Sequence, residues 1–242
     1  MSEDTFAFHA AADSVTPDAV PTAAPDRDLM LRQLRDRDPA TRMRAARAFC
    51  DIEDPRSIDA LVDLLQDACP LARVSAAYAL GRNTAPQVVD PLVRALDRDW
   101  NGYVRKGSVW ALGNARDRRA LPAVCQALRH DISAVRLWAA SALGQIGGEE
   151  AIAPLIEGLQ QDPVAAIRGN CAWALGQVLP ELSVAHSEPS SAGDRGKART
   201  ALIAALHEDA DDGVRDDARA ALEKWGEPVG LAAIAAWEDE QY

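Results

Sequence analysis

The chain has 242 residues, of which 48% are hydrophobic and 26% are charged, and its formal net charge is −11 at pH 7. This acidic balance argues against nucleic acid as a partner, because binding a phosphate backbone needs a basic stripe that releases counterions. No run of about 18 apolar residues occurs, so no membrane span is expected. The first residues are acidic where a secretory signal is basic, which favours a cytoplasmic location.

The beginning of the chain is rich in Ala, Asp and Pro, including Pro17, Pro21 and Pro25. Such a composition buries too little apolar surface to offset the entropy of folding. We therefore expect a disordered acidic tail over residues 1–26, followed by one folded unit over residues 27–242.

One short phrase, which starts with Arg and closes with Leu-Gly in its best copies, recurs along this unit. Its copies begin at Arg42, Arg73, Arg105, Arg136, Arg168 and Arg215. A step of about 31 residues is typical of one helical hairpin per repeat. Each repeat has a first helix with apolar residues at helical spacing, a polar break, and a second helix that carries the phrase. The predicted fold is all-α, a right-handed α-solenoid of about six hairpins.

The breaks before the second helices carry aspartates that are expected to cap those helices. These are Asp38, Asp67, Asp99, Asp131, Asp162 and Asp211. The Gly that closes the phrase is expected to end the second helix. The recurrent Arg is expected to pair with the Asp of the preceding loop in a structural ladder.

The step from Arg168 to Arg215 is longer than the others by about 15 residues. The surplus, at about 180–196, contains Pro, Ser and Gly and predicts a loop insertion. Such a loop serves binding or is a tolerated insertion, and both interpretations stay open. A last capping helix is expected over Val229–Trp237, with Trp100, Trp225 and Trp237 as core or capping residues.

The second helices are expected to line an inner groove of the solenoid. Counted from the Arg, the first, fifth and ninth places of each phrase share one helical face, with the second place beside them. The residues on this face are Tyr78, Arg82, Lys106, Trp110, Asn114, Leu137, Trp138, Gln145, Asn170, Trp173 and Gln177. Aromatic residues edged by amides and cations are typical of protein-binding hot spots. The alternative is that a small rotation of the helices buries these rings between layers.

Catalytic and metal-binding patterns do not emerge from the sequence. The four Cys form no CxxC pair and no cluster with zinc spacing. Iron hydroxylases of the deoxyhypusine type place His-Glu pairs on several repeats, whereas this chain has one such pair, His207-Glu208. We expect no catalytic residue, no metal site and no cofactor.

The phrase Val-Arg-x-x-Ala-Ala-x-Ala-Leu-Gly resembles the HEAT-like repeats named after phycobilisome lyases, over roughly Asp28 to Trp225. Within that family, Asn101–Leu121 and Asp131–Gly144 resemble the cyanobacterial HEAT protein that interacts with the A-type iron–sulfur protein IscA (the IaiH type). The resemblance implies a non-catalytic adaptor or scaffold in a photosynthetic cell. Its groove would bind a protein, either an IscA-type iron–sulfur protein or a phycobiliprotein.

The same family offers a second interpretation, a phycobilin lyase subunit or a bilin-detaching protein of the phycobilisome. The aromatic groove would then hold a tetrapyrrole. The segment nearest to that of the lyases, Leu137–Gly144, lacks their paired Trp. A bilin also carries two propionates, and only Arg82 and Lys106 are evident partners for them on this face.

Overall fold

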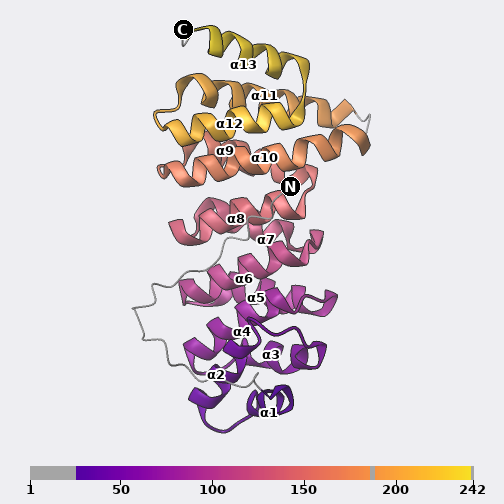
Figure 1. Ribbon diagram of the computed structural model, residues 1–242, viewed down its shortest axis with the longest axis vertical. Helices are drawn as coiled ribbons and strands as arrows, with labels where there is room; N and C mark the ends of the chain where they lie inside the picture. The colour runs from indigo at the N-terminus through magenta and orange to yellow at the C-terminus, as the bar shows by residue number, and fades with distance from the viewer. Residues whose placement is uncertain (1–25, 186–188, 241–242) are drawn as a thin grey trace, which may run out of the picture.

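The computed structural model describes residues 26–185 and 189–240. Over these residues the chain consists of α-helices joined by short loops and 3₁₀ turns, and it has no strand there. The helices stack in layers along one long axis, from α1 at one end to α13 at the other (Figure 1). The predicted all-α, right-handed solenoid of about six hairpins is confirmed.

Six helical hairpins and one closing helix make up the described stack. The first helices are α1 (Arg27–Gln33), α3 (Ile58–Leu64), α5 (Val89–Arg98), α7 (Leu121–His130), α9 (Ile152–Gln161) and α11 (Pro189–Glu208). The second helices are α2 (Pro39–Ala48), α4 (Pro70–Arg82), α6 (Gly102–Ala115), α8 (Ser133–Ile146), α10 (Ala165–Ala185) and α12 (Asp212–Trp225). The closing helix is α13 (Pro228–Glu240). Short 3₁₀ turns precede α3, α5, α7 and α9.

The described stack begins with α1 at Arg27. Asp26 caps α1, because its side chain accepts the backbone N–H groups of Asp28 and Leu29 at 3.0 and 3.2 Å. The rest of the predicted tail over residues 1–26 lies outside the described residues. At the other end, the expected capping helix is α13, and both Trp225 and Trp237 pack half-buried against the core.

Close packing of neighbouring second helices explains the phrase-closing glycines. The sequence pattern predicts that these glycines end the second helices. They lie inside the helices instead: Gly81 in α4, Gly113 in α6, Gly144 in α8 and Gly176 in α10. A Cβ atom at Gly176 would lie 2.8 Å from Cα of Ala221 in α12. The missing side chain therefore lets the two helix backbones approach, and this is a packing role rather than a capping one.

An Arg–Asp ladder joins consecutive repeats, but in the opposite sense to the predicted one. The first five phrase arginines reach forward to the Asp carboxylate of the following loop, with Nε to Oδ2 distances of 2.6 to 2.7 Å, whereas Arg215 pairs with Asp212 of its own helix. The pairs are Arg42–Asp67, Arg73–Asp99, Arg105–Asp131, Arg136–Asp162 and Arg168–Asp209. The preceding loop supplies a backbone carbonyl instead: Arg73 Nη1 donates to Asp67 O at 2.9 Å.

The aspartates of the breaks therefore divide into two groups. Asp38 and Asp211 cap α2 and α12 as predicted. The ladder aspartates lie before the cap positions. Each also accepts a hydrogen bond from a backbone N–H of its loop, as Asp162 does from Val164 at 2.9 Å. The α6 cap, for example, is Asn101 rather than Asp99.

The surplus residues of the fifth repeat lengthen two helices, which corrects the predicted loop at about 180–196. α10 continues to Ala185 with Pro180 inside it, and α11 begins at Pro189. Val178 and Leu179 are fully buried, so packing continues beyond the point where the phrase ends. Residues 186–188 lie outside the described part of the chain.

Candidate functional site

The predicted aromatic residues share one face of the stack, formed by α4, α6, α8 and α10. We call Tyr78, Trp110, Trp138 and Trp173 the aromatic face. The first three rings are half-buried and Trp173 is 38% exposed. The Tyr78 and Trp110 ring centroids lie 5.6 Å apart with an interplanar angle of 44°. A tilted aromatic pair of this kind stiffens both side chains and leaves part of each ring open to a partner.

Glycines of the preceding repeat seat two of these rings. A Cβ atom at Gly81 would lie 2.3 Å from the Trp110 ring, and one at Gly144 would lie 2.8 Å from the Trp173 ring. Each indole therefore rests against the backbone of the preceding second helix. The rings are partly inserted between layers and partly open, which is intermediate between the two orientations that the sequence left open.

The predicted amides tie the second helices together along the same face. Asn114 Nδ2 donates to Gly81 O at 3.1 Å, and Asn170 Nδ2 donates to Leu137 O at 3.1 Å and to Ser141 Oγ at 3.0 Å. Gln177 accepts a hydrogen bond from Lys224 of α12. Among the described residues, the side-chain oxygens of Asn114 and Asn170 accept no hydrogen bond, so they are acceptors open to a ligand.

The predicted cations lie towards the N-terminal half of the face. Lys106 Nζ lies 5.7 Å from the centroid of the Trp138 ring, within cation–π range. Arg82 Nε lies 3.3 Å from Glu53 Oε1, and both side chains are exposed. Leu137 is half-buried and packs against the core beside Trp138.

A hollow of about 290 Å³ brings four of the predicted residues together at the ends of α4 and α6. Arg82, Trp110, Asn114 and Gln145 line it, together with residues that the sequence analysis missed, namely Glu53, Thr84 and Arg116. Arg116 has a left-handed backbone, with φ of 51°, just after α6. Glu53 and Thr84 come from loops outside the phrase, and no periodic signal marks them.

At the opposite end of the face, α12 contributes two aspartates, Asp216 and Asp217, in addition to Lys224. Asp217 of α12 lies against α10, because a Cβ atom at Gly169 would be 2.5 Å from its Oδ2. Burial, with Asp216 and Asp211 nearby, raises the pKa of Asp217 above its usual 3.8. With these two aspartates, which are not among the predicted residues, the face runs from Arg82 and Lys106 at one end to Asp216 and Asp217 at the other.

Trp100 corrects one prediction. It was expected in the core or a cap, but it is 74% exposed in the loop before α6. Its position in the sequence does not indicate this exposure, because loop residues lie outside the helical periodicity that separates core from surface.

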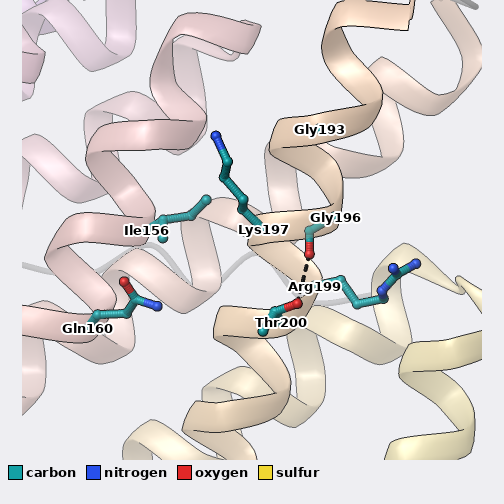
Figure 2. A pocket seen from close by; sticks show the side chains of 7 residues that line it. All are labelled: Ile156, Gln160, Gly193, Gly196, Lys197, Arg199 and Thr200. Atoms are coloured by element: carbon teal, nitrogen blue, oxygen red, sulfur yellow. Dashed lines mark hydrogen bonds between the residues drawn. The ribbon is translucent and has the colours of Figure 1, made fainter.

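Another hollow, of about 540 Å³, lies between α9 and α11 (Figure 2). Ile156 and Gln160 face it from α9, and Gly193, Lys197 and Thr200 face it from α11. Arg199 points away from α9 and pairs with Glu227 at 3.0 Å, and Lys197 pairs with Asp194 at 2.9 Å. The cations around this hollow are thus already engaged.

Among the residues that the structure describes, the thiols and histidines are not grouped into a reactive or metal-binding site. Burial raises the pKa of Cys50 to about 11 and also raises that of Cys125 and Cys171. His207 and Glu208 lie exposed at the end of α11. Within the described residues, no group of three or more His, Cys, Asp or Glu is placed to hold a metal ion. No described helix is long and apolar enough to cross a membrane.

Comparison with known proteins identifies the class that this fold defines. The HEAT repeats family matches residues 28–113 and 91–176, which together are more than half of the chain. The chain belongs to the HEAT repeat family.

Two relatives share part of the sequence. A HEAT repeat-containing taxis protein of Halobacterium salinarum is 31% identical over 139 residues, covering 57% of this chain and 31% of that protein. Deoxyhypusine hydroxylase of Mus musculus is 28% identical over 147 residues, covering 54% of this chain and 48% of that enzyme. The chain thus spans about a third to about half of the length of these relatives.

Solved structures confirm the solenoid fold. A designed armadillo repeat protein in complex with the peptide (KR)4 matches with a TM-score of 0.64 and 21% identity, covering 83% of this chain and all of that one. The complex of CpcE and CpcF of phycocyanin lyase from Nostoc sp. matches with a TM-score of 0.59 and 24% identity, covering 92% of this chain and 86% of that one. HEAT and armadillo-like repeats are typical of protein-binding scaffolds.

Proposed function

We propose that this HEAT repeat protein is a non-catalytic adaptor or scaffold that binds a protein partner along the aromatic face. The observation that carries the proposal is the row of partly open rings on four consecutive second helices, from Tyr78 to Trp173. Large rings held rigid at the centre of a surface are the usual anchors of protein interfaces.

The polar neighbours support an extended or helical protein segment as the ligand. The open oxygens of Asn114 and Asn170 suit N–H donors from such a segment. Lys106 at one end, and Asp216 and Asp217 at the other, favour a partner whose acidic part faces α6 and whose basic part faces α12. An IscA-type iron–sulfur protein and a phycobiliprotein are the specific candidates that the sequence resemblance suggests.

Bilin handling is the weaker candidate. Arg82, one of two cations for the propionates, is already paired with Glu53. The hollow beside it, of about 290 Å³, is at the lower end of the size range for small-molecule sites.

Affinity capture from a cell extract tests the proposal, with the wild-type protein and the Trp110→Ala, Trp173→Ala double variant as baits. The eluates are compared by mass spectrometry and by visible absorption. A colourless protein lost from the variant eluate supports the adaptor, and a coloured phycobiliprotein or free bilin lost in the same way supports the alternative. Equal eluates from the two baits contradict both.

A further inference from the structure

A hollow of about 560 Å³ lies on the side of the first helices, between α3 and α5. The exposed Trp100 forms one of its walls. Arg73 fixes this indole, since its guanidinium carbon lies 5.7 Å from the ring centroid while the same side chain is bound to Asp99. Apart from Arg73 of α4, the residues that line the hollow lie outside the helices of the aromatic face, and Trp100 is therefore a separate anchor.

The charges around this hollow are unbalanced. Its aspartates are already engaged: Asp67 with Arg42, Asp99 with Arg73, and Asp63 with Arg35 at 3.9 Å. Arg94 and Arg98, four residues apart on α5, are exposed and form no ion pair with any described residue. Two open cations beside an open indole make a positive site on a chain of net charge −11.

Three other hollows hold fewer unpaired cations, since Arg116 alone among the described cations that line them forms no ion pair. Arg82 pairs with Glu53 on the aromatic face, and Arg129 pairs with Glu157 between α7 and α9. Lys197 and Arg199 are paired around the hollow between α9 and α11. The hollow between α3 and α5 therefore calls for an outside ligand with carboxylates and a large apolar side chain.

The chain itself contains a segment with that chemistry. Its first residues read Met-Ser-Glu-Asp-Thr-Phe-Ala-Phe, so that Glu3 and Asp4 stand beside Phe6 and Phe8. The chain has three Phe, and the third, Phe49, is fully buried in the core. We propose that residues 3–8 dock in the hollow between α3 and α5, with the Phe side chains against Trp100 and the carboxylates facing Arg94 and Arg98.

The connection is long enough for docking within one molecule. About 17 residues separate Phe8 from Asp26, the cap of α1, and an extended chain of that length reaches roughly 55 Å. α1 and α5 are the first helices of hairpins two layers apart, or about 20 Å at the usual spacing of packed helices. The contact needs no second copy.

Photocrosslinking of the full chain tests the proposal. The photoreactive residue p-benzoylphenylalanine replaces Phe8, the protein is irradiated at low micromolar concentration, and the adducts are mapped by mass spectrometry. We expect intramolecular adducts on the α3 and α5 residues that line the hollow and on Trp100. The adduct yield should fall at least fivefold in the Arg94→Glu, Arg98→Glu variant and remain unchanged in the matched control Arg129→Glu.

Exchanging the charges of the docked segment and of α5 distinguishes a loss of docking from a disrupted fold. Adding Glu3→Lys and Asp4→Lys to the Arg94→Glu, Arg98→Glu variant should restore most of the yield, with an unchanged circular dichroism spectrum. Adducts scattered along the chain, adducts on the aromatic face, or crosslinked dimers would overturn the proposal. So would a yield that does not respond to the charge of α5.

Discussion

Arg105 and Asp131 form a two-point ion pair that joins one repeat to the next. Arg105 Nε lies 2.7 Å from Asp131 Oδ2, and Nη2 lies 2.6 Å from Oδ1, with side chains only 18% and 11% exposed. A third nitrogen, Nη1, donates to Asp99 O at 3.0 Å. Since Asp99 in turn accepts from Arg73, one guanidinium spans two loops and the ladder continues through the stack.

Removing this guanidinium should weaken the stack. Arg105→Ala leaves the carboxylate of Asp131 without its partner in a mostly buried place, and we expect a loss of about 2 kcal/mol in the free energy of unfolding. Urea unfolding followed by circular dichroism measures it. The control is Arg119→Ala, which removes a more exposed guanidinium with contacts to Asp117, Asp90 and the Pro86 carbonyl, and should leave the unfolding midpoint almost unchanged. Equal effects of the two substitutions would contradict a structural ladder.

Two helical glycines should respond to alanine with opposite signs. Gly176→Ala places a Cβ 2.8 Å from Ala221 Cα, so α10 and α12 must separate, at a cost of about 1–3 kcal/mol. Gly196→Ala in α11 meets nothing within 4 Å, and the higher helix propensity of Ala should stabilise the protein by up to about 1 kcal/mol. Thermal unfolding of both variants gives the comparison, and stabilisation by Gly176→Ala would refute close helix packing.

The repeat register, the hairpins and the ladder arginines were predictable, because sequence period and residue size act locally. The direction of the Arg–Asp pairs was not, since Asp67 and Asp99 are both near Arg73 in the repeat and only the three-dimensional stack decides between them. The packing role of Gly176 was not predictable for the same reason, because it depends on the three-dimensional stack. A glycine at the close of a phrase matches a helix end in sequence, whereas its partner, Ala221, lies on the next second helix.

Acid should weaken the ladder. Hydrogen bonds from Arg42 lower the pKa of Asp67 below its usual 3.8, and those from Arg168 do the same for Asp209. The folded state then binds fewer protons than the unfolded chain, so this stability is complete above about pH 3.8 and is lost as the pH falls through the folded pKa values. We expect the wild type to lose more unfolding free energy between pH 5 and pH 3 than the Asp67→Asn, Asp209→Asn variant. Identical losses in urea titrations at the two pH values would show that these pairs do not contribute.

The two indoles that pack on glycines, Trp110 and Trp173, should differ in their contribution to the free energy of unfolding. Trp110 is half-buried over Gly81 and pairs with Tyr78, so Trp110→Ala should cost about 2 kcal/mol of unfolding free energy. The more exposed Trp173 should cost less, about 1 kcal/mol, when truncated. Thermal denaturation of the two single variants checks the order. The reverse order would mean that Trp173 is the packing residue and Trp110 the open one.

The candidate face was predictable as a set of residues but not as a surface. Helical spacing placed Trp110 and Trp173 on one side of their helices, whereas their depth depends on glycines one repeat earlier. Trp100 shows the limit most clearly, since its exposure depends on a loop conformation and on Arg73 of another repeat. Glu53 and Arg116 come from loops, where no period marks a functional position.

The most direct test of partner binding is the dissociation constant of the captured partner for three forms of the protein: wild type, Trp173→Ala and Trp100→Ala. Trp173→Ala removes an anchor of the aromatic face with little expected loss of stability, and Trp100→Ala removes an exposed indole elsewhere. We expect a dissociation constant at least about 30-fold higher for Trp173→Ala, corresponding to about 2 kcal/mol, and an unchanged value for Trp100→Ala. Wild-type affinity in Trp173→Ala would show that the partner does not bind along the aromatic face.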